Sequence, residues 1–309
     1  MKINNSSIKK SINYLKNNEC IGIPTETVYG LAANAYSRSA VSKVFKLKKR
    51  PKKNPLIVHY YSKSQLERDC YLNKNFYKLY KKFCPGPLTF ILRLKSNSMI
   101  DNKVTNKKKS LAVRFPKHPV IRSLLNKIDF PLAAPSANIS SSISPVTKND
   151  VIDEFGKKIK YVLNGGRSNI GLESTIIDLT SKPKIIRLGG LNLEYLKKIL
   201  NVRLNYNSDT KRDYPGQRRL HYSPGIPIRL NIKDPKKNSA YILINKKKLT
   251  SRNFFYLTKN KNLEEAGKNL YKTLRKIKKR KFKLIEVEKI PNIGIGRTIN
   301  DRLQRASIK

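Results

Sequence analysis

The stretch PTETVYGLAA, residues 24–33, together with FKLKKRPKKNPLIVH, residues 45–59, decides the fold of this chain. An apolar run at 20–23 is typical of a strand, and it stops at Pro24. Polar side chains then crowd together before Gly30, so a strand end leads into a loop here. Because small-molecule sites in α/β folds lie at such strand ends, this stretch predicts a ligand site.

A helix is expected next, because apolar residues recur at three- and four-residue spacing across 40–47. Pro51 closes this helix, since the residue before a proline avoids the helical conformation. Lys48 and Arg50 therefore fall at its C-terminal end, where cations also stabilise the helix dipole without any ligand. A second strand follows and carries His59. The pattern brings two strand ends and one basic helix end toward a common pocket.

The composition indicates a globular protein with a core. The chain has 309 residues, 39% of them hydrophobic, which is enough for two domains of ordinary size. No apolar run is long enough to cross a bilayer, and the N-terminus lacks the apolar region of a signal peptide. Three cysteines and three histidines are scattered, with no CxxC pair. We expect reduced thiols, no structural zinc, no membrane association and a cytoplasmic location.

The charge is the most unusual property of the composition. Lys and Arg number 67 against 20 Asp and Glu, which gives a net charge of +47. Such a balance is typical of proteins that bind nucleic acid or another polyanion. However, the basic residues are spread along the whole chain, and Lys, Asn, Ile and Tyr all have A/T-rich codons. RNA binding and genome codon bias therefore remain two open explanations.

The order of predicted elements divides the chain into three parts. Residues 1–200 contain more strands than helices in irregular alternation, which favours an α+β or mixed α/β domain. Residues 201–226 are rich in Asn, Arg, Asp, Tyr, Pro and Gly and read as an extended linker. Residues 227–309 predict a small α/β domain built from four strands and two helices, the first helix at 262–279 and strongly basic. A solvated face is the simpler explanation for that basic helix, and an RNA-binding helix is the alternative.

Several kinds of catalytic site are excluded by their missing motifs. The sequence has no Walker A loop, no GxGxxG after a strand, no HExxH and no GxSxG. What remains is a set of polar residues at predicted strand ends and loop edges: Thr27, Lys48, Arg50, Asn54, His59, Arg114, Ser136, Asn138, Ser174 and Arg187. Cations with hydroxyl and amide donors suit a polyanion and a small polar co-ligand. Singly, each has a structural explanation such as a surface ion pair or a turn.

The order of seven segments makes the set specific. PTETVYGLAA, KLKKRPKKNPLIVH, CPGPLTF, LAVRFPKHP, APSAN, ESTIID and IIRLGG follow one another between residues 24 and 190. Together they resemble the YrdC-like threonylcarbamoyl-AMP synthases, and YPGQRRLHYSPG (214–225) resembles the linker of the two-domain members. The resemblance implies an open, twisted mixed sheet with flanking helices and a small, Rossmann-like C-terminal domain.

The resemblance also implies an activity. Members of this family are nucleotidyltransferases that make L-threonylcarbamoyladenylate and pyrophosphate from L-threonine, bicarbonate or CO2, and ATP. The product serves tRNA N6-threonylcarbamoyladenosine (t6A37) modification through a downstream transferase machinery. Mg2+ is expected with ATP, and no metal site is expected in the protein itself. Tyr222 and its linker neighbours are expected to form a lid that excludes water from the labile product.

Site residues follow from matching positions. The KxR motif is Lys48–Arg50, both expected to be catalytic, and the SxN motif is Ser136–Asn138. The residues implied around L-threonine are Thr27, His59, Arg114, Ala134 and Ser174. The residues implied around ATP are Arg50, Asn54, Ser110, Ser136, Asn138, Ser144, Arg187 and Tyr222.

Two other functions fit part of the sequence. A basic RNA-binding module without ATP turnover would use the charge but would not need the full polar set. A different carbamoyl transfer, as in hydrogenase-maturation proteins with YrdC-like domains, would bring acylphosphatase-like and zinc-finger segments, which this chain lacks.

Overall fold

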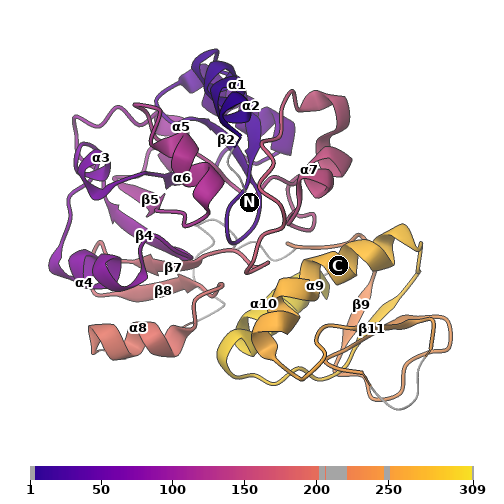
Figure 1. Cartoon of the computed structure of the whole chain (residues 1–309). Helices are drawn as coiled ribbons and strands as arrows, with labels where there is room; N and C mark the ends of the chain where they lie inside the picture. The colour runs from indigo at the N-terminus through magenta and orange to yellow at the C-terminus, as the bar shows by residue number, and fades with distance from the viewer. Residues whose placement is uncertain (1–3, 202–205, 207–220, 247–250, 308–309) are drawn as a thin grey trace.

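The structure is a computed structural model that describes residues 4–201, 206, 221–246 and 251–307. Its described strands form one sheet of eight strands and one of four, each with its own helices (Figure 1). Among these described residues, no helix is long and apolar enough to span a bilayer. The predicted linker at 201–226 lies largely outside the described residues.

The larger sheet is mixed, as expected for an α+β or mixed α/β fold. Its strand order is β1-β2-β6-β3-β5-β4-β7-β8, with only the β3/β5 and β4/β7 pairs parallel. The strands are β1 (Ile21–Ile23), β2 (Gly30–Asn34), β3 (Ile57–His59), β4 (Leu88–Arg93), β5 (Ser110–Arg114), β6 (Leu132–Ala133), β7 (Thr175–Asp178) and β8 (Lys184–Arg187). Because β3 and β5 run in parallel, His59 and Arg114 sit opposite each other at the same end.

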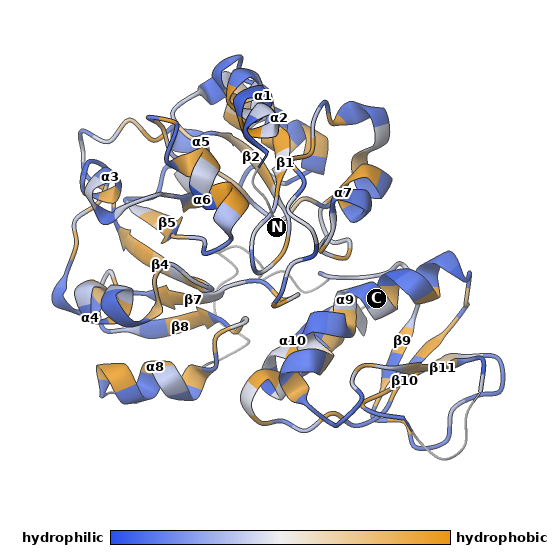
Figure 2. Cartoon of the chain, viewed as in Figure 1, coloured by the Kyte–Doolittle hydropathy of each residue, from blue (hydrophilic) through white to orange (hydrophobic). Residues whose placement is uncertain are grey.

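Helices pack their apolar stripes against this sheet (Figure 2). They are α1 (Asn5–Lys16), α2 (Arg38–Lys48), α3 (Lys63–Glu67), α4 (Lys74–Phe83), α5 (Asn102–Thr105), α6 (Pro119–Leu125), α7 (Lys148–Phe155) and α8 (Leu193–Leu200), with a 3-10 turn at Gly156–Lys158. The Thr147 side chain caps α7 in a capping box with Asp150. Lys49, in a left-handed conformation, ends α2 just before Arg50.

Two segments differ from the sequence analysis. Residues 30–34, to which it assigned no element, form strand β2, which lies between β1 and β6 and has residues 30–33 buried. The segment 96–110, whose polar, Lys- and Asn-rich composition predicts a loop or long turn, contains the short helix α5, which Asp101 caps.

The C-terminal part is a parallel α/β domain, as predicted. Its sheet has the order β11-β10-β12-β9, and all three pairs are parallel. The strands are β9 (Ile228–Leu230), β10 (Ala240–Leu243), β11 (Phe254–Tyr256) and β12 (Ile285–Val287); the helices are α9 (Leu263–Lys279) and α10 (Gly294–Ser307). Both helices lie between this small sheet and the larger domain (Figure 1).

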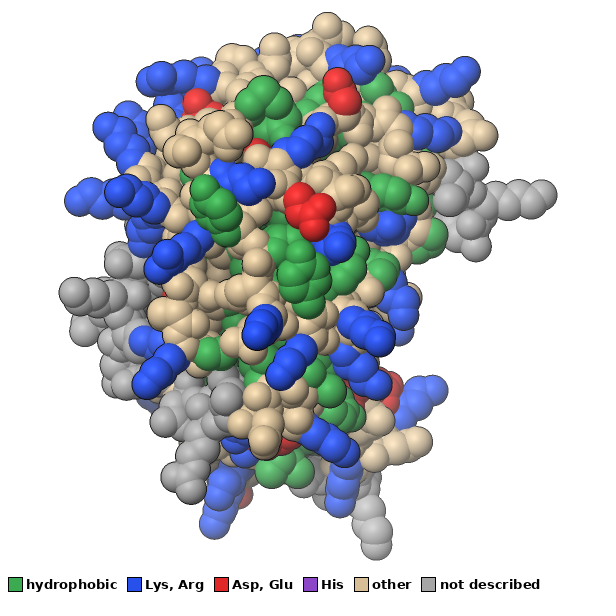
Figure 3. Space-filling model, turned by 90° about the vertical axis from the view of Figure 1, so that its left-hand side faces the viewer, with side chains coloured by type: hydrophobic (Ala, Val, Ile, Leu, Met, Phe, Trp, Pro, Cys, Tyr) green, Lys and Arg blue, Asp and Glu red, His purple; other side chains and the backbone are tan. Residues whose placement is uncertain are grey.

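The two parts are in tight contact. Gly171 has φ +74°, and a Cβ there would lie 2.6 Å from the Lys268 carbonyl oxygen, so only glycine allows this approach to α9. Arg275 of α9 donates to the Ile143 carbonyl at 2.6 Å and lies 3.6 Å from Glu154. The basic helix therefore uses Arg275 for contact with the larger domain, whereas Lys and Arg side chains elsewhere are scattered over the face in Figure 3.

Candidate active site

One pocket collects most of the predicted site residues. It encloses about 570 Å³ of empty space, its open mouth included. All five residues predicted around L-threonine line it, and so do four of those predicted around ATP: Thr27, His59, Arg114, Ala134, Ser174, Arg50, Ser136, Arg187 and Tyr222. Lys48, Asn54, Ser110, Asn138 and Ser144 are not part of the lining. Ends of β2, β3, β5 and β7 thus meet at one pocket, to which Arg50, just after α2, also belongs. The sequence predicted such a convergence for the strand end at His59 and the basic helix end, and did not predict β2.

Arg114 is oriented by a carboxylate that the sequence analysis did not single out. Its Nη2 donates to Glu26 Oε1 at 2.8 Å, and its Nε donates to the Gly86 carbonyl at 3.3 Å. Glu26 also accepts the Lys117 backbone N–H at 3.0 Å. In the described part of the chain, Arg114 Nη1 has no partner. This nitrogen can therefore bind an anion inside the pocket.

His59 is a neutral, buried side chain beside Arg114. Burial first and the charge of Arg114 second lower the pKa of His59 to about 3. Neither ring nitrogen has a hydrogen-bond partner of good geometry among the described residues, although the ring is only 3% exposed. A buried polar side chain without a partner is costly, so a ligand that hydrogen-bonds His59 would relieve this cost.

Lys48 holds the SxN loop and does not reach into the pocket. Its Nζ donates to the Ser136 carbonyl at 2.5 Å and to the Asn138 carbonyl, and the side chain is 1% exposed. Burial first and nearby Arg50 second lower the pKa of Lys48 well below its usual value. Within the loop, Ser136 Oγ donates to Asn138 Oδ1 at 2.6 Å. The KxR and SxN motifs thus form one structural unit, and its pocket-facing members are Arg50 and Ser136.

Asn54 contributes its backbone to the placement of Arg50. Arg50 donates to the Asn54 carbonyl at 3.0 Å and to the Pro55 carbonyl at 2.8 Å. Ser110 begins β5, opposite Arg93, whereas Arg114 ends the same strand at the pocket. Direct contacts of Asn54 and Ser110 with ATP stay predictions.

Arg187 and Ser174 are joined at the edge of the sheet. Arg187 Nη2 donates to the Ser174 carbonyl at 2.8 Å and to its Oγ at 3.2 Å. Ser174 Oγ also lies 2.7 Å from Thr89 Oγ1. Gly189 makes this packing possible, because a Cβ there would lie 2.3 Å from the backbone of Ser174. A cation and a hydroxyl are therefore held rigidly at this pocket wall.

The described end of the linker lies over the pocket. His221 and Tyr222 both line it, with ring centroids 4.0 Å apart. The Ser223 backbone N–H donates to the Ser141 carbonyl at 2.8 Å, and that of His221 to the Arg305 carbonyl at 3.2 Å. The Tyr222 hydroxyl is buried without a partner in the described part of the chain, and burial raises its pKa to about 12. This hydroxyl can therefore serve as a donor to a ligand.

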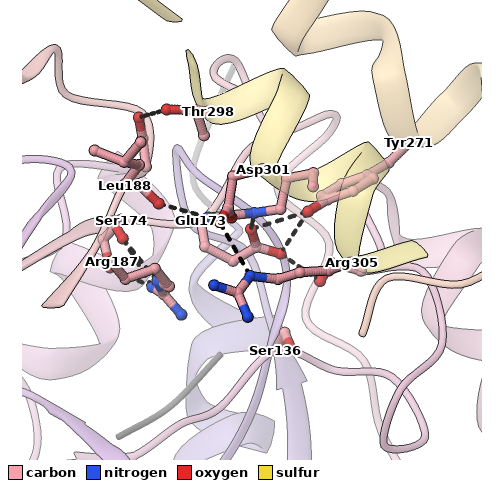
Figure 4. Close-up of polar contacts among 12 residues, drawn as sticks. Ser136, Glu173, Ser174, Arg187, Leu188, Tyr271, Thr298, Asp301 and Arg305 are labelled. Atoms are coloured by element: carbon pink, nitrogen blue, oxygen red, sulfur yellow. Dashed lines mark hydrogen bonds and ion pairs between the residues drawn. The ribbon is translucent and has the colours of Figure 1, made fainter. Parts of the chain in front are cut away.

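Glu173 connects the pocket to the C-terminal domain (Figure 4). It accepts Ser144 Oγ at 2.6 Å and the Tyr271 hydroxyl at 2.9 Å, and its Oε2 lies 2.9 Å from Arg302 Nε. Ser144 therefore touches a residue that lines the pocket, although it does not line the pocket itself.

The described residues contain no cluster of three or more His, Cys, Asp or Glu side chains that could hold a metal ion. The two acidic side chains nearest the chemistry, Glu26 and Glu173, are ion-paired with Arg114 and Arg302.

Comparisons with known proteins agree with this geometry. Residues 13–189 match the Sua5/YciO/YrdC family, described as telomere recombination, and residues 191–307 match the C-terminal domain of threonylcarbamoyl-AMP synthase. The chain belongs to the threonylcarbamoyl-AMP synthase family. The family's Pyrococcus abyssi member is 33% identical over 97% of this chain and 94% of its own, and the Bacillus subtilis member is 31% identical over 98% and 94%.

Solved structures support the same assignment. The crystal structure of P. abyssi Sua5 complexed with L-threonine has a TM-score of 0.91 at 32% identity, covering 99% of this chain and 96% of that one. Escherichia coli YciO, at 21% identity and a TM-score of 0.55, shares the fold of 60% of this chain. The two-domain architecture of this synthase family member is therefore that of Sua5.

Sequence reasoning did not single out three residues at or beside the pocket, Glu26, Glu173 and Arg302, and it included His221 only as a linker neighbour of Tyr222. Glu26 and Glu173 lie within the quoted motifs PTETVYGLAA and ESTIID. A carboxylate is unexpected in a motif that binds anions, and this could have identified both residues as partners of buried arginines. Arg302 lies in a basic segment of the other domain, where nothing in its local sequence distinguishes it.

Proposed function

We propose that this chain makes L-threonylcarbamoyladenylate and pyrophosphate from L-threonine, bicarbonate or CO2, and ATP. The observation that supports it is the convergence of Arg50, Arg114 and Arg187 on a single pocket that also contains Thr27 and Ser174. The relative whose crystal structure contains L-threonine shares this fold along 99% of the chain.

The reaction needs this concentration of positive charge. The threonine amine adds to CO2 and loses a proton, which gives an N-carboxylate. One carboxylate oxygen then attacks the α-phosphorus of ATP, the bond to the β-phosphate oxygen breaks, and pyrophosphate leaves. Nucleophile and electrophile are both anionic, so fixed cations must bring them together and stabilise the charge on the leaving group.

Each charged side chain has a position suited to one of these tasks. Arg114, held by Glu26 and Gly86, presents Nη1 to the carboxylate of L-threonine. Arg50 and Arg187 are positioned to bind the phosphates of ATP, with hydroxyls of Ser136 and Ser174 nearby in the lining. Lys48 acts in this scheme by fixing the SxN loop through two carbonyl oxygens.

His59 binds the substrate through hydrogen bonds and does not act as the general base. Its pKa of about 3 makes the neutral ring a weak proton acceptor at neutral pH. The ring nitrogens can exchange hydrogen bonds with the threonine hydroxyl or amine, which would satisfy both buried atoms. Tyr222 and His221 lie over the same pocket and would keep water from the mixed anhydride product.

Mg2+ would neutralise phosphate charge when it arrives with ATP. The product would then pass to the machinery that modifies tRNA to N6-threonylcarbamoyladenosine. The use of bicarbonate, the transfer to this machinery and a cytoplasmic location are parts of the proposal that go beyond the family assignment.

Weak RNA binding is a second candidate function. A groove between α2 and α5 begins at Arg50 and has an empty volume of about 1390 Å³. Six basic side chains and one acidic side chain line it: Arg38, Lys46, Arg50, Lys52, Lys103, Lys107 and Asp101. Such a groove suits a phosphodiester backbone, and binding there would weaken steeply with salt.

Product analysis tests the synthase proposal. Purified protein, ATP, Mg2+, L-threonine and 13C-bicarbonate should yield an adenylate that carries both the label and threonine, detected by mass spectrometry. Labelled product should disappear when L-threonine is omitted. Salt-sensitive tRNA binding without any labelled product would favour the second candidate.

A further inference from the structure

Arg302 is a buried cation of the C-terminal domain that contacts Glu173, a residue lining the pocket of the other domain. Its side chain is 1% exposed. Its Nε lies 2.9 Å from Glu173 Oε2, its Nη2 donates to the Leu188 carbonyl at 2.6 Å, and its Nη1 is paired with Asp301. All three nitrogens are therefore engaged, two of them by residues of the larger domain.

The partners of Arg302 are next to pocket residues in the sequence. Glu173 lines the pocket and precedes Ser174, whereas Leu188 follows Arg187. Arg187 and Ser174 are themselves hydrogen-bonded at 2.8 Å. One guanidinium thus fixes the start of β7 and the end of β8, which carry a hydroxyl and a cation of the site.

Arg302 also supports the linker. Its guanidinium carbon lies 4.6 Å from the centroid of the Tyr222 ring, a cation–π distance. Tyr222 stacks in turn on Tyr271, whose hydroxyl donates to Glu173. Thr298 and Asp301, from the same helix, join the network that Figure 4 shows around Glu173.

Glu173 is a buried carboxylate of the pocket, and Arg302 neutralises its negative charge. It is 5% exposed, and the charges of Arg302 and Arg187 both lower its pKa against the effect of burial. Without Arg302, Arg187 would be the remaining cation that lowers the pKa of Glu173. The Arg187 guanidinium would then be attracted to Glu173 and away from the phosphates that it is proposed to bind.

We propose that Arg302 is a positioning residue of the synthase site, through which the C-terminal domain completes the pocket. By neutralising Glu173 and bracing Leu188 and Tyr222, it keeps Ser174 and Arg187 placed for the substrates. This inference rests on the proposed function.

The matched control is Arg275, a second cation that joins the two domains. It lies on α9, donates to the Ile143 carbonyl and is near Glu154, and it does not line the pocket. If Arg302 only fastened the domains together, Arg302→Met and Arg275→Met would have the same kinds of effect.

The test compares steady-state pyrophosphate release and calorimetric binding of L-threonine and ATP. Arg302→Met should lower kcat/KM for ATP at least about 100-fold, whereas Arg275→Met should change it less than about threefold. Arg302→Lys should be intermediate, because one ammonium cannot reach both Glu173 and Leu188 in the same geometry. Glu173→Gln combined with Arg302→Met should recover part of the loss, because the unpaired charge is gone.

Calorimetry separates the two proposals. Arg302→Met should weaken binding of at least one substrate about tenfold relative to Arg275→Met, and this comparison needs no turnover. Equal kinetics and equal binding in the two variants, with only a change in melting temperature, would overturn the positioning role. If Arg302→Met does not fold, the kinetics and substrate binding of Arg302→Lys and Glu173→Gln are compared with those of Arg275→Met in the same way. A wild-type protein that binds both substrates without releasing pyrophosphate would instead contradict the proposed function.

Discussion

Arg114 and Glu26 form a buried ion pair in which Arg114 Nη2 lies 2.8 Å from Glu26 Oε1. Their side chains are 5% and 9% exposed. The pair orients the guanidinium and leaves its Nη1 without a partner among the described residues. In the proposed function this nitrogen binds the carboxylate of L-threonine, and Glu26 supports that contact although it does not line the pocket.

Arg114→Gln should raise the KM for L-threonine at least about 100-fold, because a charge-assisted contact to the substrate carboxylate is lost. It should also destabilise the protein by about 3 kcal/mol, because Glu26 is left as an unpaired buried charge. Glu26→Gln combined with Arg114→Gln should recover most of the stability and none of the threonine binding. Recovery of binding in the double variant would show that Arg114 does not contact the substrate.

Arg50→Ala should lower kcat/KM for ATP by about 100-fold or more, since a fixed cation beside the phosphates is removed. Arg38→Ala is the control, because Arg38 is exposed at the start of α2 and lies outside the pocket. Steady-state pyrophosphate release measures both. Similar losses in the two variants would mean that the overall charge matters and the position of Arg50 does not.

Lys48→Met should abolish most turnover without removing any contact to a substrate. The substitution keeps the length of the side chain but leaves the Ser136 and Asn138 carbonyls unsatisfied, so the SxN loop should move. Lys49→Met, at the exposed neighbouring position, should retain activity. A comparison of amide hydrogen exchange should show faster exchange in the SxN loop for Lys48→Met only. Lost turnover with unchanged exchange would favour a direct catalytic role, as the family resemblance implies.

Acid should destabilise the folded protein through its histidines. Burial is the first cause that lowers the pKa of His59 to about 3, and it also lowers the pKa values of His118 and His221. The unfolded chain binds protons near pH 6.5, whereas folded His59 stays neutral, so stability falls as the pH falls below that value. For His59 alone the free energy of unfolding should drop by about 2 kcal/mol between pH 7 and pH 5.

Denaturant titrations of the wild type and His59→Gln at several pH values check this effect. The variant should lose less stability than the wild type over the same interval. Parallel curves would show that folded His59 is protonated like the unfolded residue.

The fold could be predicted from the sequence where a pattern was local. The apolar spacing of Phe76, Leu79, Tyr80 and Phe83 predicts a helix, and α4 runs from Lys74 to Phe83. The segments 172–178 and 184–190 flank a short turn and predict an antiparallel pair, which β7 and β8 form. Strand β2 was missed because its run of small apolar residues has no alternation; both faces of it are buried. Sequence periodicity cannot distinguish such a strand from a buried loop.

Nine of the predicted site residues line one pocket and five do not, and the direction in which each side chain points could not be predicted from the sequence. Their contacts with the substrates stay predictions. Lys48 and Arg50 are two residues apart, and Lys49 between them has a left-handed backbone conformation. Lys48 is buried against the SxN loop, whereas Arg50 lines the pocket. Glu173 and Arg302 are 129 residues apart in the sequence, so their pairing depends on how the domains pack.

Pyrophosphate release from ATP, with and without L-threonine, tests the central claim most directly. With purified protein, Mg2+ and bicarbonate, release should depend on L-threonine and fall to background in Arg50→Ala, while Arg38→Ala stays active. Folded protein that binds ATP but releases pyrophosphate at the same rate with or without L-threonine would contradict the synthase account.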